Sequence, residues 1–183
     1  LVYEICEVGA VPANCDQATA IVVVLNPIVA NDDDYSATPL TSGDTTPSVI
    51  VNDTLDGNPA VIGTNPGEVT LTGVTVPTEL TLNPDGTITV NPNTPSGTYT
   101  VVYEICENGA VPANCDQATA TIVVDNVIDA VDDDYSATPL TPGDSTPSVI
   151  VNDTLNGTPV VIGTNPGEVT LTGVTVPTEL TLN

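Results

Sequence analysis

Large apolar residues alternate with smaller or polar residues along much of the chain, which is the pattern of half-buried β-strands. The alternation is clearest over residues 98–107, where Tyr99, Val101, Tyr103 and Ile105 occupy every second position. Similar short runs, bounded by turn residues, fill the rest of a stretch of about 100 residues. They predict strands near residues 33–37, 48–52, 60–64, 68–76, 80–83, 87–90, 98–107 and 115–124.

Turn residues separate these expected strands. Segments 65–67 (Asn-Pro-Gly) and 83–86 (Asn-Pro-Asp-Gly) combine a proline of fixed φ with glycine or asparagine, which tolerate positive φ. Seven or eight short strands in about 100 residues predict an all-β fold of immunoglobulin-like β-sandwich domains. A β-solenoid is the alternative, but solenoid repeats are several times shorter.

The chain repeats itself with a period of 100 residues, and only 13 of the 83 overlapping positions differ. Near-identical neighbouring units indicate a tandem array in which each unit has the same role. We expect a complete domain over about residues 30–129, where apolar runs meet acidic clusters at both ends. Residues 1–29 would then be the last strands of a preceding domain, and residues 130–183 the first part of a following one. The chain is expected to be either a window on a longer array or a permuted subunit.

The charge of the chain is entirely negative, because its 24 acidic side chains are accompanied by no Lys, Arg or His. Clustered carboxylates repel one another and oppose compact folding, so we expect an external cation, most naturally a divalent metal. Phosphate backbones and anionic lipids attract basic proteins, which excludes nucleic acid and membrane surfaces as expected partners. No apolar run approaches the roughly 20 residues that span a bilayer. A high net charge is also typical of disordered chains, but the alternating apolar runs can bury a core and so argue against disorder.

Two cysteines recur in each repeat, Cys6 with Cys15 and Cys106 with Cys115. Each pair lies at the end of one expected strand and the start of the next, which favours a disulfide across the mouth of a hairpin. A zinc site is the rival interpretation, but two thiols without His or a second Cys pair make a poor ligand set. Disulfides indicate an oxidising compartment, and thus an extracellular protein.

The acidic clusters are candidate calcium sites, since calcium takes six to eight oxygen ligands in flexible geometry. Alternation along a strand would let Asp32 and Asp34 converge while Asp33 faces away. A second junction adds acidic residues where the first has Leu25 and Val29, so tighter binding is expected there. The proposed ligands are Asp32, Asp33, Asp34, Asn52 and Asp53, and then Asp125, Asp129, Asp132, Asp133, Asp134, Asn152 and Asp153. Another possible cluster is formed by Glu104, Glu107 and Asp116, and the alternative for all of them is solvated surface charge.

Several of these motifs resemble a known group of proteins. The residues are Ala130 to Tyr135, Val151 to Thr154, Asn83 to Val90, and Tyr103 to Glu107 followed by Cys115-Asp116. Together they resemble tandem immunoglobulin-like and cadherin-like repeats of very large secreted Bacteroidetes adhesins, including gliding-motility surface proteins. The resemblance implies seven-stranded sandwiches, a filament on the bacterial cell surface and calcium at domain junctions. Cadherins carry longer acidic signatures, so individual ligands are not carried over from them.

The function expected from these features is that of a structural stalk, stiffened by calcium, in a surface fibre. Its partners would be neighbouring repeats, other copies in a fibre and surface glycans. No enzymatic activity is expected, because the chain has no imidazole base, no Schiff-base amine and no cationic side chain to stabilise developing negative charge. Two alternatives remain: a calcium-dependent glycan-binding module, and a subunit that assembles by donating strands to other copies.

Overall fold

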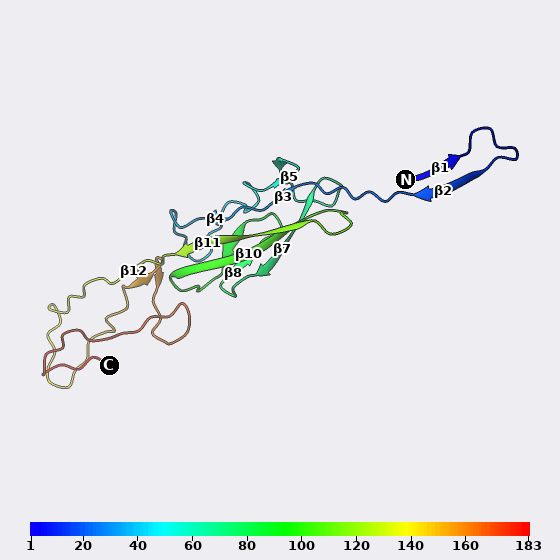
Figure 1. Ribbon diagram of the computed structural model, residues 1–183. Helices are drawn as coiled ribbons and strands as arrows, with labels where there is room; N and C mark the ends of the chain where they lie inside the picture. The colour runs from blue at the N-terminus through cyan, green and yellow to red at the C-terminus, as the bar shows by residue number, and fades with distance from the viewer.

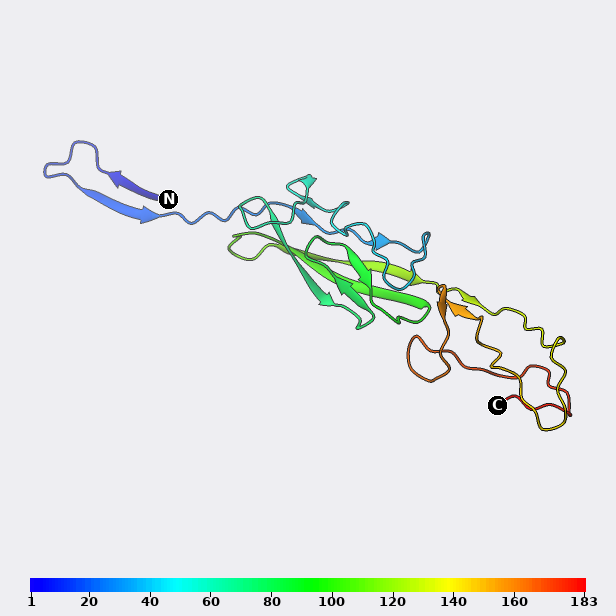
Figure 2. The same cartoon turned by 180° about the vertical axis from the view of Figure 1, so that it is seen from behind.

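A computed structural model describes residues 1–183 and confirms the all-β prediction, since it contains several small sheets and no helix. Three parts follow one another along an elongated molecule (Figure 1). A lone N-terminal hairpin lies at one end, a central body with most of the strands in the middle, and a sparsely paired C-terminal part at the other end. The view from behind shows the same order (Figure 2).

The central body contains the largest sheet, of four strands in the order β4-β11-β10-β7. The long strands β10 and β11 pair antiparallel, β7 pairs antiparallel with the other edge of β10, and β4 runs parallel to β11. The bounds of these strands are Asp33–Asp34 for β4, Val69–Thr75 for β7, Gly97–Glu107 for β10 and Cys115–Val124 for β11.

Two smaller sheets complete the central body. One has the order β3-β5-β6 and the other pairs β8 with β9, all antiparallel. Their bounds are Ile28–Val29 for β3, Thr54–Leu55 for β5, Asn58–Pro59 for β6, Leu80–Leu82 for β8 and Ile88–Val90 for β9.

The core follows from the alternation seen in the sequence. Val101, Tyr103 and Ile105 of β10 are buried, and the residues between them are only partly covered. The opposing strand β11 buries every second residue in the same way, from Ala118 to Val124. Each large apolar side chain removed from water contributes about 1.5–3 kcal/mol. Because one face of the hairpin β10–β11 carries so many of them, this hairpin is the centre of the domain.

The flanking parts repeat pieces of the central body. The N-terminal hairpin joins β1 (Val2–Cys6) to β2 (Cys15–Thr19) in the register of β10 and β11, one period earlier. The C-terminal part contains β12, β13 and β14, paired as β3, β5 and β6 are. These strands span Ile128–Asp129, Thr154–Leu155 and Thr158–Pro159. Backbone pairing therefore follows the sequence repeat.

Three of the expected strands differ from the structure. Of residues 33–37 only Asp33–Asp34 form a strand. Residues 49–52 form turns, and residues 60–64 contribute only one isolated bridge, between Ile62 and Val69. The apolar run Val49-Ile50-Val51 suggested a strand, yet Val49 is buried whereas Val51 is 74% exposed. A short apolar run does not distinguish a strand from a turn that places one side chain in the core.

Candidate functional site

A buried oxygen cluster surrounds the hydroxyl of Tyr103, on the inward face of β10. The phenol oxygen lies 3.2 and 3.1 Å from the two carboxylate oxygens of Asp53 and 3.2 Å from Oδ2 of Asp33. The main-chain carbonyls of Asn31 and Val49 lie 3.0 and 3.1 Å from it. Tyr103 and Asp53 are completely buried, and Asp33 is partly buried. The cluster thus joins β10, β4 and the loop before β5.

The proton count of this cluster explains its electrostatics. A phenol donates one hydrogen bond, but five acceptor oxygens surround this one. Burial raises the pKa of Asp33 from 3.8 to about 6, against the hydrogen bond from Tyr103, which lowers it. Burial also raises the pKa of Asp53, and burial with the two nearby carboxylates raises the pKa of Tyr103. The folded chain therefore binds a proton at Asp33 more tightly than a free carboxylate does.

Hard oxygen donors of this kind suit calcium. Of the predicted ligands, the cluster brings together Asp33 and Asp53, with the carbonyls of Asn31 and Val49 beside them. Asp53 also accepts a 2.7 Å hydrogen bond from the Asn31 amide, which fixes its orientation. Asp33 and Asp53 are thus the two predicted ligands whose carboxylates lie in one oxygen cluster, with the Tyr103 hydroxyl between them.

The neighbours of Asp33 bind backbone groups instead. Asp32 accepts a 2.8 Å hydrogen bond from the Thr119 amide of β11, and Asp34 accepts one of 2.9 Å from the Ser36 amide in a turn. The Nδ2 atom of Asn52 donates to the carbonyl of Asp32 at 3.3 Å. As the alternation predicts, Asp33 lies on the opposite face from Asp32 and Asp34. Asp32 and Asp34 do not share a ligand site, because each accepts a hydrogen bond from a different backbone amide.

Most of the predicted ligands of the second junction lie on the surface. Asp125, Asp129 and the triplet 132–134 are all exposed, and Asp134 accepts a 2.8 Å hydrogen bond from Ser136. Asp153 is half-buried and accepts 2.8 Å from the Val131 amide, as Asp53 does from Asn31. The side-chain amide of Asn152 donates to the Val131 carbonyl at 3.4 Å.

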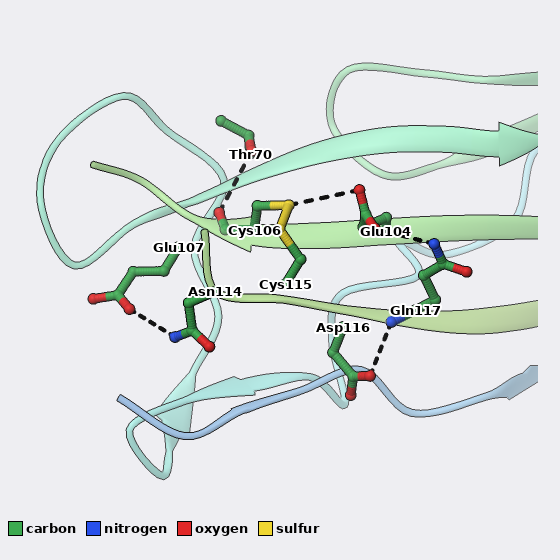
Figure 3. The surroundings of a disulfide bond; sticks show 8 residues. All are labelled: Thr70, Glu104, Cys106, Glu107, Asn114, Cys115, Asp116 and Gln117. Atoms are coloured by element: carbon green, nitrogen blue, oxygen red, sulfur yellow. Dashed lines mark hydrogen bonds between the residues drawn. A yellow bond between two sulfur atoms is a disulfide. The ribbon is translucent and has the colours of Figure 1, made fainter. Parts of the chain in front are cut away.

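Both expected disulfides are present, Cys6–Cys15 and Cys106–Cys115. Figure 3 shows the second bond closing the end of β10 and β11, with the carboxylate of Glu104 beside it. Each disulfide lies beside a glutamate, Glu4 or Glu104. Only these two Glu-Cys-Cys groups bring three Cys, Asp or Glu ligand atoms within 4.8 Å of one another. Their sulfur atoms are covalently paired, so they do not form thiolate metal sites.

The junctions between the parts depend on two asparagines that the sequence reasoning did not single out. Asn126 donates through its backbone amide to Ser96 Oγ and through Nδ2 to the Thr94 carbonyl, both at 2.8 Å. Its Oδ1 accepts 2.9 Å from the side chain of Asn156, in the C-terminal part. Asn126 therefore bonds to both sides of its junction. Asparagine occupies this position in both repeats although the residues on either side of it differ. That pattern was the signal in the sequence that could have identified it.

At the first junction Asn26 is bound to the other end of the central body. Its Nδ2 donates 2.5 Å to Glu107 at the end of β10, and its carbonyl accepts 2.7 Å from Asn114. Glu107 also accepts 2.7 Å from Asn114, so the three residues form a closed network. Glu104, Glu107 and Asp116 do not form the single cluster that the sequence suggested, because Asp116 instead accepts a hydrogen bond from the Ala30 amide.

Comparisons with known proteins do not assign the chain to a family. No protein-family model matches the chain, and no curated protein is significantly similar to it. The structure has no helix able to span a lipid bilayer. Two disulfides in a small β-protein are typical of an oxidising environment.

Proposed function

We propose that the chain is a structural stalk, made of immunoglobulin-like units joined end to end in a calcium-stiffened fibre at a bacterial cell surface. The observation that carries this proposal is the junction at Asn126, where one side chain bonds to the central body and to the part that follows. A spacer needs this property, since free rotation at each junction would let the array collapse on itself.

The arrangement of strands supports immunoglobulin-like topology for the unit. The order β11-β10-β7 matches the G-F-C strands of an immunoglobulin sheet. The opposite sheet would contain β8, β9 and the segment around Thr45, which forms a bridge with Thr89. Near-identity of the repeats supports the stalk as well, because each unit then has the same spacing role.

The calcium part of the proposal is supported by charge and by the buried oxygen cluster. The chain carries a net charge of -24 and no cationic side chain, so intramolecular ion pairs cannot offset its repulsion. Asp33 and Asp53 face each other across the Tyr103 hydroxyl in the interior, where mutual repulsion is least screened. A divalent ion there would join the entry strand β4 to the body, as a brace near the junction.

Small-angle X-ray scattering of the dilute 183-residue chain tests the proposal, with calcium and with excess EGTA. We expect an elongated particle in calcium, and in EGTA a scattering profile that fits parts bending more freely at their junctions. Asn126→Ala should shorten the mean particle in calcium, because the hydrogen bonds across the junction are lost. Asn58→Ala is the matched control, since the Asn58 side chain bonds only to Asp56 within its own turn.

A scattering profile unchanged by chelation would remove calcium from the proposal. A profile in calcium that fits freely rotating parts, and does not differ between the wild type and Asn126→Ala, would contradict the stalk itself.

A further inference from the structure

We infer that the orientation of one unit on the next is set by a second contact, in which Asn93 of the central body packs against Gly167 of the part that follows. This inference rests on the proposed stalk, and it names the surface through which consecutive units fit together. The surface consists of the loop 91–96 on the central body and the loop 163–169 on its neighbour.

The contact is visible in the space around Gly167. A Cβ atom added to Gly167 would lie 2.6, 2.7 and 2.8 Å from Oδ1, Cγ and Cβ of Asn93. Carbon atoms pack best at about 3.5–4.0 Å, so these distances are clashes. Rotation of the Asn93 amide would not relieve them, because the Cβ atom of Asn93 is itself too close. A residue with a side chain at position 167 would therefore displace Asn93.

The counterpart Gly67 shows that the turn alone does not account for this approach. Both glycines have left-handed backbone conformations, with φ of 85° at Gly67 and 86° at Gly167. In both turns the amide of the following glutamate donates to an asparagine carbonyl, at 3.1 and 3.0 Å. Yet a Cβ atom added to Gly67 would meet nothing within 4 Å. The turn needs glycine in both places, and the contact is an additional property of position 167.

The loop that carries Asn93 is fixed to the central body. The Asn93 amide donates a 3.0 Å hydrogen bond to Oγ of Ser42. The next residue, Thr94, is buried, and its hydroxyl lies 2.9 and 2.8 Å from the carbonyls of Glu79 and Asn91. Asn93 has φ 65°, a left-handed conformation that asparagine tolerates better than most residues. Its side chain is thus presented to the neighbouring part in a fixed position.

The loop that receives Asn93 is formed as it is in the complete unit. The Val169 amide donates to the Val161 carbonyl at 2.8 Å, and the Gly163 amide donates to the Val169 carbonyl at 3.0 Å. The central body has the same two bonds, at the same lengths, one period earlier. The carboxylate of Glu168 also accepts from the backbone and side-chain amides of Asn165, at 2.8 and 2.9 Å.

The two loops can approach each other in spite of the charge of the chain. Residues 91–96 include no acidic side chain, although the chain carries 24. The one carboxylate of the receiving loop, on Glu168, is bound to Asn165. Contact through these loops therefore avoids the repulsion that acidic surfaces would meet.

A second contact does what the first cannot do alone. Asn126 lies where the chain passes from one part to the next, and a part held only there can rotate about that point. Motion between domains is the normal expectation unless an interface prevents it. Asn93 and Gly167 are far in sequence from this crossing, and Pro95 and Glu168 beside them line one cleft. Two separated contacts remove the rotation and give the stalk its direction.

NMR residual dipolar couplings of the full chain, weakly aligned in an uncharged gel in calcium, test this inference. The couplings show whether two parts of a molecule keep one relative orientation. In the wild type, the amides of the central body and of residues 150–170 should fit a single alignment tensor. Gly167→Ala should abolish this agreement and leave residues 150–170 more weakly aligned, because the added methyl group displaces Asn93.

Gly67→Ala is the matched control, since it places the same strain in the same turn but faces open space. This variant should keep the single tensor. Asn93→Gly removes the side chain at a backbone conformation that glycine adopts readily, and it should loosen the junction with both loops intact. In that background Gly167→Ala should cause no further loss of alignment, because the atoms that it would meet are gone.

Three results would overturn the inference: equal effects of Gly67→Ala and Gly167→Ala, a single tensor retained in Gly167→Ala, or additive effects of the changes at positions 93 and 167. A single tensor that survives all of these changes but is lost in Asn126→Ala would leave the stalk in place and remove only the second contact. Parts that share no orientation even in the wild type would contradict the contact and the stalk together.

Discussion

Tyr103 shows how one residue can hold segments that are far apart in the chain. Its hydroxyl reaches Asp33, Asp53 and the Val49 carbonyl, from positions 50 to 70 residues earlier. Because the group is completely buried, water cannot replace these contacts. The alternation over residues 98–107 predicted that Tyr103 faces inward, but not what its hydroxyl would find there.

Removing that hydroxyl should destabilise the central body. Tyr103→Phe leaves the buried carboxylate of Asp53 and the partly buried carboxylate of Asp33 without their shared donor, and we expect the free energy of unfolding to fall by about 2 kcal/mol. Chemical denaturation followed by circular dichroism would measure the change. Tyr99→Phe is the matched control, since the Tyr99 hydroxyl bonds to the Pro95 carbonyl in an exposed position. An equal loss in both variants would contradict a special role for the buried cluster.

The raised pKa of Asp33 gives the metal-free protein a pH-dependent stability. The pKa is about 6 in the folded chain and 3.8 when unperturbed, so the folded chain binds the proton more tightly. The stability contributed by the protonated carboxyl is complete below about pH 4 and is lost as the pH rises through about 6.

Thermal unfolding in EGTA should therefore give a melting temperature that falls between about pH 4 and pH 6. Asp33→Asn should flatten this part of the profile, because the amide does not titrate. Below this range Asp44 and Asp85 act in the opposite direction, since hydrogen bonds from Thr41 and Thr87 lower their pKa values. A wild-type melting temperature that rises over this interval would show that the Asp33 proton does not control it.

At the scale of elements, the hairpin β10–β11 dominates the central body, and its disulfide closes a loop with a sequence separation of 9. Replacing both Cys106 and Cys115 with Ser should lower the stability of the central body by about 2.5 kcal/mol in the chain-entropy model. The same double change at Cys6 and Cys15 is the control, because that hairpin stands apart from the central body (Figure 1). Hydrogen exchange of β7 amides would separate the two cases. Equal protection of β7 in both double variants would contradict the prediction.

The elements were predictable where the pattern was long and the turn chemistry strong. Strands β10 and β11 agree closely with the expected residues 98–107 and 115–124, because period-two alternation extends over their whole length. The two-residue strands β3, β5 and β6 carry too few positions for any period to be visible. The cysteine pairs were predictable because their spacing spans one hairpin.

The oxygen cluster was only partly predictable, for a related reason. Asp33 and Asp53 were recognisable as candidate ligands, but their meeting at Tyr103 depends on long-range packing of β4 and the loop before β5 against β10. Local alternation correctly put Asp33 on the opposite face from Asp32 and Asp34, but it did not tell which face would meet the core, because that depends on the pairing of β4 with β11.

At the scale of the whole molecule, the repeat and the charge act together. Like charges along the chain repel one another, which favours an extended arrangement over a compact one. The junction asparagines add direction to this extension, since Asn26 and Asn126 bond to opposite ends of the central body.

The parallel pairing of β4 with β11 decides how the central body would bear tension. Pulling on the segments that precede β4 and follow β11 would slide the two strands past each other in opposite directions. Hydrogen bonds from Tyr35 to Thr121, from Leu40 to Val123 and from Asp125 to Leu40 lie along this seam. They would be loaded in shear and would have to break together, whereas the bonds of an antiparallel pair pulled from one end open one at a time. A unit built in this way resists stretching at the place where force enters it.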